Sequence, residues 1–226
     1  MAATRDAGRP SRRRLWWALW AWAAVALLFL VLAAFARFYD RFPADERIAH
    51  AIQGIDVPAF GGFLDFVNLL GDAWLYVTLT LVLSAAFVAV RAGSEALLLV
   101  VTFAPRGLNS LIKGFVERPR PSPELIDGPQ DASGFGFPSG HTVGTTVLFA
   151  LLFFLLPVLV PWRPVRWALQ GGCLLLVLAA GPARVYVGVH WPSDALGGYL
   201  LALLFLAPLV GGYYALRGRF AADSGA

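Results

Sequence analysis

Long apolar runs separated by short polar segments dominate the pattern of this 226-residue chain. A transmembrane helix needs about 20 mostly apolar residues. Six segments come close to or exceed this length, and each is predicted to cross a membrane. They are Leu15–Phe35, Ala73–Val90, Ala96–Ile112 (interrupted by Pro105), Thr142–Val160, Trp167–Val187 and Ala195–Leu216. The pattern therefore predicts an all-α fold, a polytopic six-helix membrane bundle.

The first apolar run has two interpretations. Ala34-Phe35-Ala36 is similar to the cleavage site of a signal peptide. The run is longer than the apolar region of about 7–15 residues that signal peptides carry, which favours an uncleaved helix. Tryptophans at its start are then expected at the membrane interface. They are Trp16, Trp17, Trp20 and Trp22.

The segment between the first two spans has its own periodicity. Within Ala44–Val57, Ile48, Ile52 and Ile55 recur at helical spacing. This predicts a short amphipathic helix that lies on the outer membrane surface. The polar residues Asp45, Glu46, Arg47, Gln53 and Asp56 fall outside the isoleucine stripe. Phe60–Leu70 is predicted as a further, partly buried helix that leads into the second span.

Composition supports membrane insertion. Hydrophobic residues make up 58% of the chain and charged residues 14%, against about 25% charged in soluble domains. The mean hydropathy is +0.68, which excludes a disordered chain, a collagen-like chain and a typical soluble enzyme. A single cysteine, Cys173, excludes a disulfide framework and a cysteine-based zinc site.

The net charge of +4 reflects topology rather than nucleic-acid binding, since no basic polar domain exists. With a cytoplasmic N-terminus, ten of the 18 basic residues but three of the 14 acidic ones lie on the inner side. The positive-inside rule therefore predicts that both termini are cytoplasmic, in the inner or plasma membrane. The predicted division is a basic tail (1–14), one membrane domain (15–216) and a second tail (217–226).

Polar residues at membrane depth mark one face of the third span. A charged group there costs at least about 2.5–3.5 kcal/mol on insertion scales. The spacing of the polar residues places them on one helix face, which is expected to look into the bundle. They are Thr102, Arg106, Asn109, Ser110 and Lys113. Arg106 is expected either to pair with Asp65 or Asp72 or to help position the groups on this face.

Three clusters of polar residues fall on the predicted outer side. They are 113–121, 137–141 and 184–194, and they hold two of the three histidines. Lys113, Arg120 and Arg184 supply positive charges suited to phosphate. Ser139 is a candidate N-cap for the fourth span, and free backbone N–H groups at a helix start bind anions. The clusters together predict a phosphoryl site.

The two histidines suggest a division of roles. Asp194 follows His190 by four residues, so a carboxylate bonded to one ring nitrogen would leave the other free as a nucleophile. His141 is the candidate proton donor to the leaving oxygen. Asp194 has an alternative role as the cap of the sixth span. No metal site is predicted, and Asp127 and Asp131 are assigned to a solvated loop.

These motifs resemble those of the type 2 phosphatidic acid phosphatase (PAP2) family, which shares its helical core with vanadium haloperoxidases. The family signature is Lys-x6-Arg-Pro, then Pro-Ser-Gly-His, then Ser-Arg-x5-His-x3-Asp. The matching residues are Lys113, Arg120 and Pro121; Pro138, Ser139, Gly140 and His141; and Arg184, His190 and Asp194. Arg118-Pro119 is out of register with the first motif and is assigned no role. Ala183 replaces the serine of the third motif.

The resemblance implies a lipid phosphatase that needs neither a metal nor a cofactor. His190 would form a phosphohistidine, and His141 would protonate the leaving oxygen and later activate water. The implied phosphate ligands are Lys113, Arg120, Ser139, the Gly140 N–H and Arg184. The hydroxyl lost at Ala183 would cost about 0.5–1.5 kcal/mol, which predicts weaker or differently tuned phosphate binding.

An interfacial site favours a lipid phosphate that enters from the bilayer. Family analogy favours undecaprenyl diphosphate, with phosphatidylglycerophosphate and phosphatidic acid as other candidates; no nucleic-acid partner is expected. Two alternatives stay open at this point. One is a lipid phosphotransferase that uses the same histidine, and the other is a non-catalytic membrane lipid-binding protein.

Overall fold

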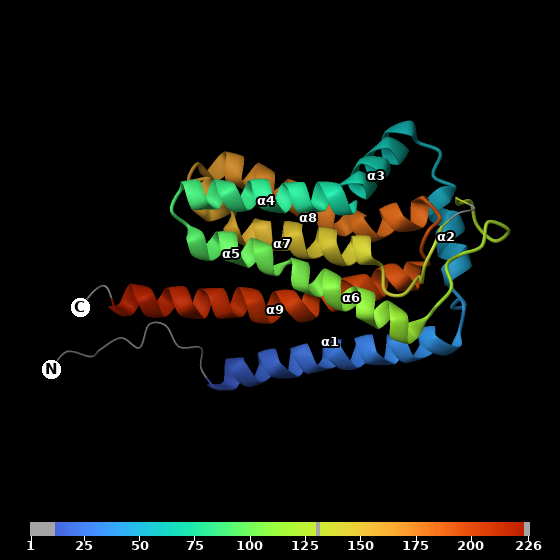
Figure 1. The fold of residues 1–226 in the computed structure, drawn as a ribbon, viewed down its shortest axis with the longest axis horizontal. Helices are drawn as coiled ribbons and strands as arrows, with labels where there is room; N and C mark the ends of the chain where they lie inside the picture. Colours follow the sequence, from blue (N-terminus) through green and yellow to red (C-terminus); the bar gives the residue numbers. More distant parts are fainter. Residues whose placement is uncertain (1–11, 130–131, 224–226) are drawn as a thin grey trace.

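Helices make up the regular structure of this chain. The computed structural model describes residues 12–129 and 132–223, and no strand occurs among them. Figure 1 shows the arrangement of the helices. They are α1 (Arg12–Phe38), α2 (Asp45–Gln53), α3 (Pro58–Leu70), α4 (Ala73–Ala89), α5 (Gly93–Val101), α6 (Phe103–Val116), α7 (Gly140–Leu159), α8 (Arg163–Tyr186) and α9 (Pro192–Asp223).

The predicted six-span membrane bundle is confirmed. Within the described residues, α1, α5 with α6, α7, α8 and α9 are long and apolar enough to cross a membrane. α3 and α4 give a further candidate span only when taken together, and the 71° bend between them is that of a broken span or a re-entrant loop. The bend therefore separates the predicted helix 60–70 from the predicted second span.

Several element ends differ from the sequence-based boundaries by a few residues. The third predicted span breaks at Thr102 and not at Pro105, which lies in the first turn of α6, where a missing N–H costs little. α1 already begins at Arg12, while residues 1–11 of the predicted tail lie outside the described residues. α9 continues to Asp223, past the predicted end of the sixth span.

α7 is the central helix of the bundle. Of its 18-residue apolar window, 67% is buried inside the protein, against 6% for α1. A helix that is apolar around its whole circumference can be enclosed by other helices, as α7 is, or face lipid, as α1 does. α7 packs against α4, α5, α6, α8 and α9, as Figure 1 illustrates, and α1 lies at the periphery against α6 and α9. The first turn of this enclosed helix carries His141.

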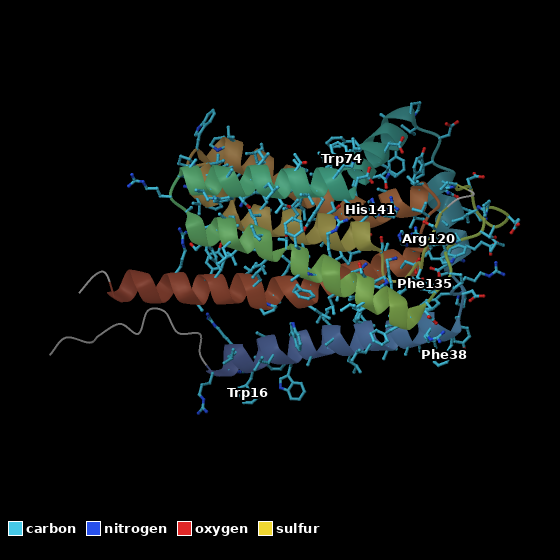
Figure 2. All side chains as sticks on the ribbon, in the orientation of Figure 1. Trp16, Phe38, Trp74, Arg120, Phe135 and His141 are labelled. Atoms are coloured by element: carbon cyan, nitrogen blue, oxygen red, sulfur yellow. The ribbon has the colours of Figure 1, made fainter. Side chains whose placement is uncertain are left out.

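The three motif clusters lie at one end of the bundle. The start of α1 and the end of α9 are at the opposite end, whereas α2, the end of α6 and the start of α7 lie together (Figure 1). In Figure 2, His141 and Arg120 are at the end where α2 lies, and Trp16 is at the other. The predicted convergence of the clusters on one side of the bundle is thus seen in the fold.

The predicted amphipathic helix exists as α2, and two of the three isoleucines of the predicted stripe lie on the outside of the protein. Ile48 is 40% exposed and Ile55 is 39% exposed, whereas Asp45 and Ala49 are buried. The helix packs against α8 and α9 through this other face. On this buried face, the carboxylate of Asp45 forms an ion pair with the buried Arg118. This pairing holds one face of α2 against the bundle and leaves Ile48 exposed on another.

Candidate active site

The end of α6 holds the loop that follows it. Glu117 ends α6 in the left-handed region (φ 52°), and its N–H donates to the carbonyl of Lys113 at 2.9 Å. The Nζ atom of Lys113 donates to the carbonyls of Phe135 and Gly136, the latter at 3.0 Å. The N–H of Gly136 donates to the carbonyl of Arg118 at 2.7 Å. Lys113 thus fixes the segment that leads into α7.

The predicted N-cap of α7 is confirmed. The hydroxyl of Ser139 accepts hydrogen bonds from the Thr142 N–H at 3.4 Å and from the Thr142 hydroxyl at 3.0 Å. The N–H of Ser139 donates to the carbonyl of Asp194 at 3.0 Å, which ties the start of α7 to α9. A β-carbon on Gly140 would lie 3.0 Å from the Asn109 amide, so the glycine lets α6 approach this helix start.

His190 and Asp194 form a buried pair. The Nδ1 atom of His190 lies 3.3 Å from Oδ2 of Asp194, and both side chains are enclosed. The same Oδ2 accepts a hydrogen bond from the N–H of Trp191 at 3.0 Å. Asp194 is the third residue of α9, and a side chain at this position commonly caps a helix by bonding the N–H of the residue before its first turn. Asp194 therefore contacts His190 and caps α9 at the same time, so the predicted role beside the histidine and the predicted role as a helix cap are compatible.

His190 lies in a strongly cationic environment. Burial first, and then the charges of Lys113, Arg184, Arg120 and His141, hold the pKa of His190 well below its ordinary value. The imidazole is therefore neutral at physiological pH. With Nδ1–H directed at the carboxylate of Asp194, the lone pair on Nε2 is left available for chemistry.

Two arginines from separate segments complete the cationic group. Arg120 donates to the carbonyls of Gly134 at 3.2 Å and Val189 at 3.0 Å. Arg184 donates through Nη1 to the Asn68 side chain on α3. Its buried Nε has no acceptor among the described residues. An unpaired buried donor is costly unless a ligand satisfies it, which fits a site for an anion.

His141 has a carboxylate partner that sequence analysis did not assign to it. Its Nε2 atom lies 3.0 Å from Oδ1 of Asp72, and both side chains are partly exposed. Asp72 follows the bend between α3 and α4. A β-carbon on Gly71 would come within 2.5 Å of the His141 ring, so the bend can approach the histidine only with glycine there. Gly71 and Asp72 stand directly before the apolar run of α4, and this glycine followed by a carboxylate was the signal in the sequence that could have indicated the contact.

Arg106 supports the same bend. It donates to the carbonyl of Gly71 at 3.3 Å, and its guanidinium lies over the Tyr76 ring at 4.4 Å. Asp72, one of its two predicted partners, bonds His141 instead. Arg106 therefore acts on the surroundings of His141 through the main chain.

Arg118, which the motif register left without a role, is the most enclosed cation of the site. Its residue exposure is 1%, and its guanidinium bonds the carboxylates of Asp45 at 2.9 Å and Asp194 at 2.6 Å. Sequence analysis missed it because alignment to Lys-x6-Arg-Pro selects Arg120.

The described residues contain no group of three or more histidine, cysteine, aspartate or glutamate side chains placed to hold a metal ion. The predicted loop residue Asp127 is exposed, and Asp131 lies outside the described residues. The groups that gather around His190 are cations and a second imidazole, a set that suits an anionic ligand.

Comparisons with known proteins give a matching family model and several similar proteins. Residues 94–217 match the model of the PAP2 superfamily. Phosphatidylglycerophosphatase B of Bacillus subtilis (strain 168) is 32% identical over 185 residues, 79% of this chain and 87% of that protein. An undecaprenyl-diphosphatase of Sulfolobus acidocaldarius is 24% identical over 183 residues, 77% of this chain and 82% of that protein.

A solved structure also matches. The crystal structure of a transmembrane PAP2-type phosphatidylglycerolphosphate phosphatase from Bacillus subtilis has a TM-score of 0.70 and 28% sequence identity with this chain. The match covers 84% of this chain and 94% of the other. The likeness therefore extends beyond the motif clusters to most of the bundle.

The close contact at the bend generates a stability prediction. We expect Gly71→Ala to destabilise the protein by about 1–3 kcal/mol, because the added methyl forces the His141 ring to move. Thermal unfolding of the purified protein in detergent measures the change. Gly62→Ala is the matched control, since its β-carbon would meet no atom within 4 Å. Equal melting temperatures for the two variants would contradict the prediction.

Proposed function

This chain belongs to the PAP2 superfamily, and we propose that it removes a phosphate from a membrane lipid through a covalent intermediate on His190. It is a multi-span membrane phosphatase, like the relatives it matches. The observation that carries the proposed mechanism is a buried imidazole, held by Asp194, whose pKa is lowered by burial and by the nearby charges of Lys113, Arg184 and Arg120.

The first chemical step forms a nitrogen–phosphorus bond. The Nε2 lone pair of His190 attacks phosphorus opposite the ester or anhydride oxygen, while Nδ1–H stays bonded to Asp194. The phosphorus–oxygen bond breaks, and its electron pair goes to the leaving oxygen. In the substrate complex, where the phosphate charge favours an imidazolium, His141 gives that oxygen its Nδ1 proton, because its Nε2–H is directed at Asp72. The products are the dephosphorylated lipid and phosphohistidine.

The second step returns the enzyme to its starting state. Water attacks the phosphorus of the intermediate, and the now neutral Nδ1 of His141 takes its proton. The nitrogen–phosphorus bond breaks, and its electron pair returns to Nε2 of His190. Inorganic phosphate leaves, and His141 is protonated again.

Phosphate oxygens are proposed to bind the cationic group and the start of α7. Lys113, Arg120 and Arg184 neutralise the charge, and the unpaired Nε of Arg184 is a ready donor. Ser139 and the N–H of Gly140 lie at a helix start, where the macrodipole favours anions. Because the Ser139 hydroxyl already accepts from Thr142, its own proton is left to donate to phosphate.

The substrate is proposed to be a lipid whose phosphate lies in the headgroup layer. The site is at the end of the bundle opposite the start of α1 and the end of α9 (Figure 1). The charge bias along the sequence favours cytoplasmic termini and an outward-facing site. The two relatives that span most of the chain are named for phosphatidylglycerophosphate and undecaprenyl diphosphate, so these are the two substrates to compare.

A substrate panel tests this proposal. Phosphate release is measured from phosphatidylglycerophosphate, undecaprenyl diphosphate and phosphatidic acid with the purified protein in mixed micelles. We expect release from at least one lipid, acid-labile protein-bound phosphate in rapidly quenched wild-type samples, and neither with His190→Ala. Turnover by a folded His190→Ala variant would remove the nucleophile. Phosphate that appears only on an added acceptor lipid would identify a phosphotransferase instead.

Asp72 gives a prediction that separates acid catalysis from binding. Asp72→Asn is expected to slow lipid hydrolysis about 10- to 100-fold, because the amide stabilises the protonated His141 less well. The rate of hydrolysis of an aryl phosphate, whose leaving group needs little protonation, is expected to fall much less in this variant. Asp65→Asn is the control, since Asp65 is an exposed carboxylate on the neighbouring α3. Equal losses on both substrates would argue against acid catalysis by His141.

The cationic surroundings of His190 predict a pH effect. Arg120 lowers the pKa of His190, so Arg120→Gln raises it, and the nucleophile becomes protonated at a higher pH. The fall of kcat/KM on the acid side is therefore expected to begin at higher pH in the variant than in the wild type. Arg37→Gln, which removes an exposed arginine that pairs with Glu117, serves as the control. An acid limb that does not move would contradict this account.

A further inference from the structure

Arg118 is a buried cation that the proposed reaction does not use directly. Its side chain is fully enclosed, although enclosing a charge is costly without close partners. Nη1 donates to Oδ1 of Asp194 at 2.6 Å and to the Ser193 hydroxyl at 2.7 Å. Nη2 donates to Oδ2 of Asp45 at 2.9 Å. One guanidinium thus joins α2 to the first turn of α9, next to the proposed nucleophile.

Two further contacts fix the plane of the guanidinium. Its Nε donates to the carbonyl of Asp40 at 3.2 Å, and its central carbon lies 4.6 Å from the centre of the Phe42 ring. Arg118 therefore has partners on both ends and one face of its planar fork. A planar fork with fixed partners loses little freedom for each bond it forms.

Asp45 completes the arrangement from α2. Its Oδ1 accepts the N–H of Ser193 at 2.9 Å, and its Oδ2 accepts the Ser193 hydroxyl at 2.7 Å. The Phe42 N–H donates to the same Oδ2 at 2.8 Å. Because these bonds hold the residue next to Asp194, Asp45 orients the start of α9 as well as the arginine.

We propose that Arg118 and Asp45 form a positioning clamp that sets the orientation of the Asp194 carboxylate and thereby the tautomer of His190. The inference rests on the proposed nucleophilic role of His190. Arg118 occupies Oδ1 of Asp194, which directs Oδ2 toward the Trp191 N–H and His190 Nδ1. Both residues act through Asp194 and not on phosphate. In the tautomer so favoured, Nε2 carries the free lone pair.

Kinetics of Arg118→Met give the first test. We expect kcat for lipid hydrolysis to fall about 10- to 100-fold, as is typical when a group that orients a catalytic side chain is removed, with KM little changed. Arg118→Lys keeps the charge but cannot reach both carboxylates and Ser193, so it should restore only part of kcat. Arg37→Gln is the control for loss of an exposed arginine at the same end of the bundle.

Histidine NMR gives a readout that does not need turnover. The chain has three histidines, so ¹⁵N-histidine labelling of the full protein in micelles yields few signals, and His190→Ala assigns those of His190. In the wild type we expect His190 to be neutral with the proton on Nδ1. In Arg118→Met we expect a mixture of tautomers, with the signals of His50 unchanged.

The outcomes are distinguishable. A folded Arg118→Met variant with wild-type kcat and an unchanged His190 tautomer would overturn the clamp while leaving the phosphatase proposal intact. If the wild type releases no phosphate, but Arg118→Met still changes the His190 tautomer, the proposed function is refuted and the clamp stands. If Arg118→Met does not fold, Ser193→Ala removes one hydroxyl shared by the clamp and should show a smaller kcat loss of the same kind. An unaffected Ser193→Ala variant would then count against the clamp.

Discussion

Burial of charge at one end of an apolar bundle is the constraint on which this structure depends. A charged side chain at membrane depth persists only if protein groups replace the water it loses. The cations here meet that condition in different ways. Lys113 bonds two carbonyls, Arg184 bonds an amide, and Arg118 bonds two carboxylates. These partners come from segments far apart in the chain, so satisfying the charges also assembles the site.

The scaffold places these charges through α7 and the bend between α3 and α4. α7 is enclosed by its neighbours, so the groups at its first turn cannot shift without disturbing the core. The bend brings Asn68 to Arg184 and Asp72 to His141 from one short stretch of chain. The end of α3 and the bend that follows it therefore serve both the phosphate-binding side and the acid side of the proposed reaction.

The sequence predicted the spans and the shared location of the motif clusters because both depend on local signals. Apolar runs of membrane length and residues at fixed spacing can be recognised without knowledge of distant partners. The partners themselves could not be recognised. Arg118 lies 73 residues from Asp45 and 76 from Asp194, and no pattern along the chain connects them. The buried face of α2 was not recognised for the same reason, since it depends on the ion pair between Asp45 and the distant Arg118.

Ala183 shows how a departure from the family motif can be absorbed. The residue packs in an apolar cluster with Leu64 and Val67 of α3 and with Ala179. A helix turns by about 100° per residue, so this side chain and that of Arg184 leave α8 in different directions. A hydroxyl at 183 would enter the apolar cluster, and burying a methyl there contributes about 0.8 kcal/mol. This is close to the roughly 0.5–1.5 kcal/mol of one lost neutral hydrogen bond. The alanine therefore suits the fold without restoring the lost phosphate contact, and Asn68, from the same α3 surface, supplies a polar contact to Arg184.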